Sequence, residues 1–90
     1  MDKLTLKTES NRKRSFLREQ LAGMVTAEII WYITQDSGVG EAEAMKQFYG
    51  SEVFGKLMDF ETGLYRESPA YVYDLYNIEQ EHGHLVQLEE

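Results

Sequence analysis

Apolar side chains recur every three or four residues from Leu17 to Ile33, and this pattern constrains the fold more than any other feature of the chain. Such spacing places the apolar side chains on one face of an α-helix, which must then pack against other elements. We predict a long helix over residues 12–36, ended by Gly38, which suits a left-handed cap position. Gly23 lies inside this helix, and a close helix crossing would explain a glycine there.

Three shorter helices are predicted to follow the long one. Apolar spacing and turn residues indicate helices over residues 41–49, 52–59 and 69–82. The clearest start signal is Ser68 followed by Pro69, because serine caps an orphan amide and proline suits the first helical position. We expect the last helix to turn one stripe inward, with Val72 and Tyr76 beside it; the stripe is formed by Tyr71, Leu75, Ile78 and His82.

Length and composition limit the chain to one small domain. Its 90 residues are 42% hydrophobic, enough for a single core, and it has no cysteine. The absence of cysteine excludes a disulfide framework, a thiolate zinc site and a cysteine nucleophile. We therefore expect an all-α fold without a sheet: a small bundle of about four helices, one long, two short and one medium. Residues 1–10 are expected to form a flexible basic and polar arm, and residues 11–90 the helical domain.

The net charge of −7 is unevenly distributed. Residues 1–18 carry six cations and two anions, a net +4, whereas the rest carries three cations and fourteen anions, a net −11. A basic arm on an acidic body can contact nucleic acid, dock onto a protein, or stay solvated. We do not expect nucleic-acid binding, because the acidic body repels phosphates. In that alternative, the residues making the contact would be Arg12, Lys13, Arg14 and Arg18.

The five apolar side chains of Ile29–Ile33 point to all sides of the long helix, which predicts an interface. The short helices span too little length to cover it, so Ile30 or Trp31 should stay uncovered, and a two-fold dimer would hide them. Tyrosines cluster in the loop and last helix, and tyrosine suits interfaces. We therefore expect a homodimer, with a protein partner also considered, and the interface candidates are Ile30, Trp31, Tyr65 and Tyr73.

No motif in the chain indicates catalysis, so we do not expect an enzyme. There is no nucleophile elbow, phosphate loop or zinc-protease motif. Glu79 and His82 have a spacing that could share a metal, with His84 nearby, but a histidine at the negative end of a helix is the better explanation. Glu28, near the apolar stripe, is better read as a structural carboxylate than as a general acid. We assign no catalytic residue, cofactor or metal ligand. The apolar run Ile29–Ile33 is far shorter than the about 20 residues of a membrane span, and no export signal is visible, which favours the cytoplasm.

Residues 43–79 contain three recognisable segments, FYGSEVFGKLMD, ETGLYRESP and YVYDLY. In these segments the chain resembles a group of small bacterial helical proteins whose genes lie near toxin–antitoxin-type genes. No catalytic residues are established for that group, so the resemblance implies none here. It implies a protein-binding or regulatory role. We expect a small acidic helical protein-interaction module that acts as an accessory or antitoxin-like partner of another protein. The alternative is a dimeric regulatory nucleic-acid-binding protein that uses the basic arm.

Overall fold

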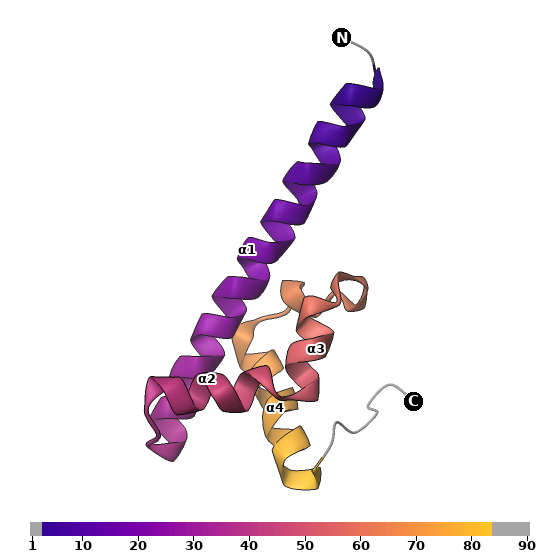
Figure 1. Cartoon of the computed structure of the whole chain (residues 1–90). Helices are drawn as coiled ribbons and strands as arrows, with labels where there is room; N and C mark the ends of the chain where they lie inside the picture. The colour runs from indigo at the N-terminus through magenta and orange to yellow at the C-terminus, as the bar shows by residue number, and fades with distance from the viewer. Residues whose placement is uncertain (1–2, 84–90) are drawn as a thin grey trace.

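The computed structural model describes the backbone of residues 3–83 and the side chains of residues 16–83. Over this range the chain forms four α-helices and two short 3-10 turns, with no strand (Figure 1). The small all-α bundle predicted from the sequence is confirmed. Its elements are α1 (Lys3–Ser37), α2 (Glu41–Tyr49), α3 (Glu52–Met58), η1 (Phe60–Thr62), η2 (Leu64–Arg66) and α4 (Pro69–His82).

The long helix α1 begins at Lys3, well before the expected start at residue 12. No glycine or proline interrupts residues 3–22, and a helical segment that packs against nothing needs no apolar face. The N-terminal part of α1 therefore continues as helix and projects past the bundle (Figure 1). The arm predicted over residues 1–10 belongs to α1 from Lys3 onward, and its side chains lie outside the described residues. No helix within residues 3–83 combines the length and apolar character that crossing a membrane would require.

The helix ends follow the cap residues that the sequence supplies. The Ser68 hydroxyl accepts a hydrogen bond from the Tyr71 amide at 3.2 Å at the start of α4. The Ser51 hydroxyl does the same for the Phe54 amide at 3.1 Å at the start of α3. Gly38 follows α1 with φ +76°, a left-handed conformation that favours glycine. The caps predicted at Ser68 and Gly38 are confirmed, and Ser51 caps α3 in the same way as Ser68 caps α4.

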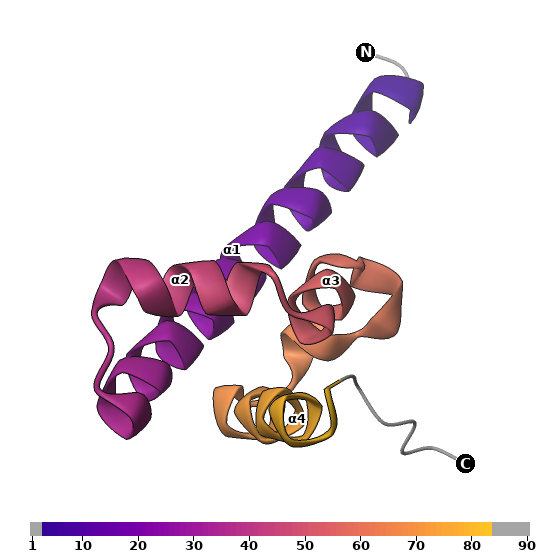
Figure 2. The ribbon, with the colours of Figure 1, turned by 60° about the horizontal axis from the view of Figure 1, so that its bottom comes forward.

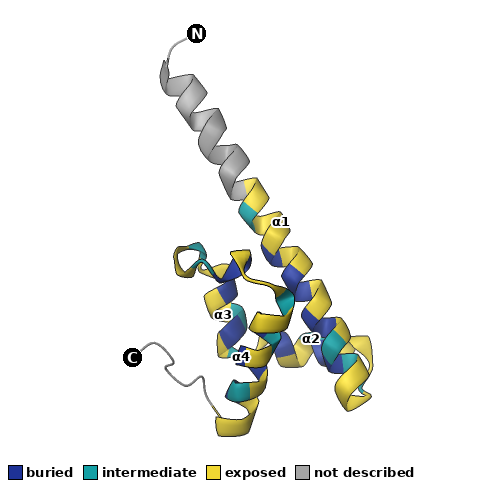
Figure 3. Cartoon of the chain, turned by 180° about the vertical axis from the view of Figure 1, so that it is seen from behind, coloured by how far each residue is buried: buried dark blue, intermediate teal, exposed yellow. Residues whose placement is uncertain are grey.

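One hydrophobic core holds the helices together. The C-terminal part of α1 packs against α2, α4, η2 and α3, so the three shorter helices are grouped beside it (Figure 2). Because the first buried residue described on α1 is Ala22, the core forms only from that point of the helix onward (Figure 3). The largest side chains that are fully enclosed are Phe48, Ile29, Leu57, Val53 and Val72.

The inward face of α4 differs from the expected one. Leu75 is buried as expected, but Tyr71 is 45% exposed and His82 is exposed, so the predicted stripe is wrong at its two ends. The face of α4 that is buried instead packs the Tyr76 ring against Phe48. It also brings the Glu79 carboxylate within hydrogen-bonding distance of the Val53 amide on α3. The side chains that α4 buries are Val72, Leu75, Tyr76 and Glu79.

Candidate functional site

The helix α1 carries large exposed apolar side chains off its buried face, and two of them, Leu21 and Met24, also line a hollow with Tyr65 and Arg66 of the bundle. The buried positions of α1, from Ala22 to Ile33, face the bundle (Figure 3). At 3.6 residues per turn, Leu17, Met24 and Trp31 are seven residues apart and line up along one side. Leu21 lies beside this line, one turn after Leu17. We define the α1 seam as the four exposed side chains Leu17 (56% exposed), Leu21 (42%), Met24 (65%) and Trp31 (57%).

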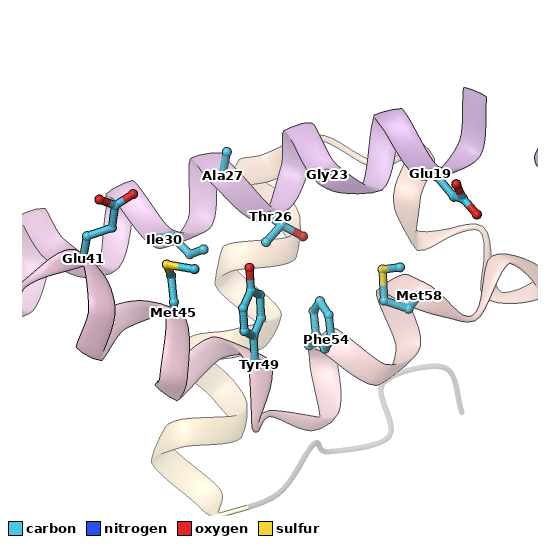
Figure 4. A pocket seen from close by; sticks show the side chains of 10 residues that line it. All are labelled: Glu19, Gly23, Thr26, Ala27, Ile30, Glu41, Met45, Tyr49, Phe54 and Met58. Carbon is cyan, nitrogen blue, oxygen red and sulfur yellow. The ribbon is translucent and has the colours of Figure 1, made fainter. Parts of the chain in front are cut away.

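A groove of about 440 Å³ lies on another side of α1, between this helix and the pair of short helices α2 and α3. Figure 4 shows Met45, Tyr49, Phe54 and Met58 pointing from α2 and α3 toward α1. Gly23 lies on the α1 side of this groove, and a Cβ placed there would meet no atom within 4 Å. The close helix crossing expected at Gly23 is therefore not formed within the described chain. The groove is a second surface with apolar side chains, separate from the seam.

The four predicted interface residues lie in different environments. Trp31 belongs to the seam, and its ring centroid lies 5.8 Å from that of Tyr32 in an edge-on contact. Ile30 is 8% exposed and Tyr65 is 7% exposed, so both belong mainly to the core. Tyr73 is half-buried against the same core. Of the four, Trp31 is the one that the fold leaves on the surface.

Tyr73 joins α4 to the C-terminal end of α1. Its hydroxyl donates a hydrogen bond to Asp36 Oδ2 at 2.6 Å, and its ring centroid lies 5.0 Å from that of Tyr32. Burial raises the pKa of the Tyr73 phenol to about 12, and the hydrogen bond and charge of Asp36 add to this shift. Tyr73 therefore closes an internal contact instead of taking the outward position expected from the sequence.

Of the residues considered for nucleic-acid contact, Arg18 is the one whose side chain is described. It is half-buried, and its charge and hydrogen bonding help to lower the pKa of Tyr65. The larger cause of that lowered pKa is Arg66, whose Nε donates to the Tyr65 hydroxyl at 3.1 Å. Arg18 thus interacts with the bundle. The other candidates occupy α1 positions whose side chains lie outside the described part: Arg12, Lys13 and Arg14.

Glu79 has a structural role that the sequence did not indicate. Its carboxylate is 7% exposed and accepts hydrogen bonds from the backbone amides of Glu52 at 2.7 Å and Val53 at 3.0 Å. With the Ser51 hydroxyl on the Phe54 amide, three of the first amides of α3 are satisfied by side chains. The carboxylate also complements the positive end of the helix dipole. Glu79 therefore fixes α3 against α4.

The metal and acid–base candidates are not brought together. In the portion of the chain that the structure describes, no three His, Asp or Glu side chains gather in a metal-binding arrangement. His82 is exposed at the end of α4, and His84 lies outside the described residues. Glu28 is exposed on α1, where it shares the lining of a second hollow, of about 600 Å³, with Arg66.

The chemistry of the α1 seam is that of a contact surface. Its side chains are two leucines, a methionine and a tryptophan, so they favour other apolar surfaces over water. The groove between α1 and the short helices also carries methionine and aromatic side chains. No protein-family model, curated protein or solved structure matches this chain.

Proposed function

We propose that this protein is a homodimeric protein-interaction module and that the α1 seam is its interaction surface. The observation that carries the proposal is the exposure of four large apolar side chains, between 42% and 65%, along one side of one helix. Contiguous exposed apolar surface on a small protein marks a contact site. Phe16, which is 59% exposed, extends this surface toward the N-terminus.

The spacing of the seam supports a helical partner. Leu17, Met24 and Trp31 repeat every seven residues and Leu21 follows Leu17 by four, which is the heptad pattern of paired helices apart from Glu28, which occupies the core position after Met24. A homodimer supplies this surface twice around a two-fold axis, the commonest symmetry of soluble oligomers. The resemblance in residues 43–79 extends the proposal to an accessory or antitoxin-like role, in which the module would also hold a protein partner.

A regulatory role in nucleic-acid binding is the second candidate. One observation favours it: α1 is continuous through residues 12–14, so three consecutive cationic residues belong to a helix that projects from the bundle (Figure 1). The net charge of −7 opposes it, because the body repels phosphates. The interaction of Arg18 with Tyr65 also withdraws one cation from that surface.

The seam is tested by removing its apolar character without adding charge. We expect the full chain to sediment at about twice 10.5 kDa at micromolar concentration. The double variant Leu17→Gln, Met24→Gln should raise the dimer dissociation constant by at least about tenfold, since each buried side chain contributes more than about 1 kcal/mol. Glutamine preserves helix propensity, so the fold should persist in circular dichroism.

The matched control is Tyr71→Gln, which removes a side chain of similar exposure (45%) from α4, away from the seam. It should leave the dissociation constant unchanged. A wild-type mass near 10.5 kDa, or equal effects of the seam and control variants, would contradict the proposal.

A further inference from the structure

The charge of α1 changes sign along its length. Residues 3–18 carry six cations and one anion, a net +5, while residues 19–37 carry three anions and no cation, a net −3. The seam crosses this boundary, because Leu17 lies in the basic half and Met24 and Trp31 lie in the acidic half. A helix that pairs through the seam must therefore bring charged halves together as well as apolar side chains.

We infer that a second copy packs on the α1 seam in an antiparallel direction, with the basic half of each α1 along the acidic half of the other. This inference rests on the proposed function and adds the orientation of the partner. A parallel pair would place +5 beside +5 and −3 beside −3, whereas the antiparallel pair places opposite charges together. The helix dipoles also oppose one another in the antiparallel pair, which is the favourable arrangement.

The shape of the protein leaves room for this arrangement. At 1.5 Å per residue the 35 residues of α1 span about 52 Å, and the 19 residues before Ala22 span about 28 Å. That part of the helix projects past the bundle (Figure 1), and the seam residues Leu17 and Trp31 are more than half exposed. Two copies can therefore pair along α1 with their bundles on the outer sides of the helix pair.

The heptad positions fix a register for the antiparallel pair. Such pairs set the two heptad core positions against each other, so Leu21 of one copy faces Met24 of the other. Trp31 then lies level with residues 12–14 of the other copy, all cationic, and a cation near an indole ring is stabilised. Asp36 lies level with Glu9 of the other copy, between Lys7 and Arg12 of the same helix.

Distances between single labels distinguish the two orientations. The chain has no cysteine, so Gln35→Cys and Gln20→Cys each introduce one site for a spin label on an exposed position of α1. In the antiparallel register, labels at residue 35 lie about 25 residues apart along the axis, or close to 40 Å, and labels at residue 20 lie below about 20 Å. A parallel pair gives distances below about 20 Å at both positions.

The long distance at residue 35 with the short one at residue 20 is the result we expect. Short distances at both positions would overturn the antiparallel inference and leave the homodimer standing. The absence of any distance between labels at either position would overturn the homodimer itself. These two failures are thus told apart within one experiment.

Charge reversal supplies a second readout. The full-length variant Arg12→Glu, Lys13→Glu, Arg14→Glu should raise the dissociation constant of the dimer at least about tenfold at low salt. The control Lys46→Glu, Lys56→Glu lowers the net charge at exposed positions of α2 and α3 and should change the constant by less than about threefold. An unchanged dimer for the first variant, with loss of binding to a DNA duplex probe, would assign the basic segment to nucleic acid and overturn the inference.

Discussion

At the scale of single residues, the seven-residue helix α3 depends on a carboxylate that another helix supplies. An isolated helix of this length does not form in water, because nucleation costs more than so few hydrogen bonds return. Glu79 accepts from two amides that have no partner within the helix, and it does so at 7% exposure. A hydrogen bond to a buried charged group contributes about 1.5–3 kcal/mol. Glu79 is therefore expected to stabilise the whole bundle.

Replacing Glu79 with alanine should lower the free energy of unfolding by about 2–3 kcal/mol, because two amides of α3 lose their acceptor. Urea unfolding followed by circular dichroism measures this change. The control Glu81→Ala, at an exposed position of the same helix, should cost less than about 0.5 kcal/mol. Equal unfolding midpoints for the two variants would show that the carboxylate does not support α3.

The contrast between Ser68 and Glu79 shows which residue roles the sequence can predict. Ser68 caps an amide three residues ahead, so the role is contained in a local pattern. Glu79 accepts from amides 26 and 27 residues earlier, and no local pattern contains that contact. A signal was nevertheless available: Glu79 follows Val72 by seven residues, so it continues an apolar stripe with a carboxylate. A carboxylate at such a position needs buried donors.

At the scale of elements, α1 combines two apolar faces with one polar extension. The core face explains why the helix was predictable, since its spacing is regular from residue 22 onward. The extension over residues 3–11 was not predictable from periodicity, because it packs against no described element and its pattern is polar. In α4, by contrast, two apolar stripes compete, and only the position of α3 decides between them. Element type was therefore easier to predict than element boundaries or faces.

Replacing the glycines at the two ends of the packed part of α1 with alanine should change the free energy of unfolding in opposite directions. Gly23→Ala should raise the free energy of unfolding by about 1 kcal/mol, because glycine is unfavourable inside a helix and its Cβ position is open. Gly38→Ala should lower it by about 1–2 kcal/mol, because φ +76° is unfavourable for alanine. Chemical unfolding of both variants at one low protein concentration checks the pair. A loss of stability for Gly23→Ala would point to an unrecognised close approach at that position.

At the scale of the whole molecule, the packed bundle and the projecting basic helix are unlike in shape and charge. The described part measures 54 × 34 × 19 Å, an elongated outline set by α1. The reasoning that short helices cannot cover the long one placed Trp31 on the surface, and it is 57% exposed. Ile30, Tyr65 and Tyr73 lie mainly in the core, because apolar character does not reveal whether a residue meets its own bundle or a partner. Charge sign along α1, in contrast, is fully visible in the sequence.

The hydrogen bond between Tyr73 of α4 and Asp36 of α1 predicts how the stability of the whole molecule changes at high pH. Tyr73 donates to Asp36 across the C-terminal end of α1, and its pKa is raised to about 12 in the folded protein from 10.0. Between these two values the folded chain retains a proton that the unfolded chain has lost, so rising pH favours unfolding. The contribution of Tyr73 to stability should be fully present below about pH 10 and lost as pH approaches about 12.

Two measurements check this alkaline behaviour. Because burial also raises the pKa of Tyr76, phenolate absorbance of the folded protein should show more than one late-ionising tyrosine, and the variant Tyr73→Phe should have one fewer. In unfolding experiments, the stability advantage of the wild type over Tyr73→Phe should shrink as pH rises through this range, because the variant has no phenol to ionise. The variant Asp36→Asn should lower the late pKa of Tyr73 only in part, since burial is the larger cause and the carboxylate the smaller one. If Tyr73→Phe leaves the late absorbance step intact, the phenol does not keep its proton in the closed contact between α1 and α4.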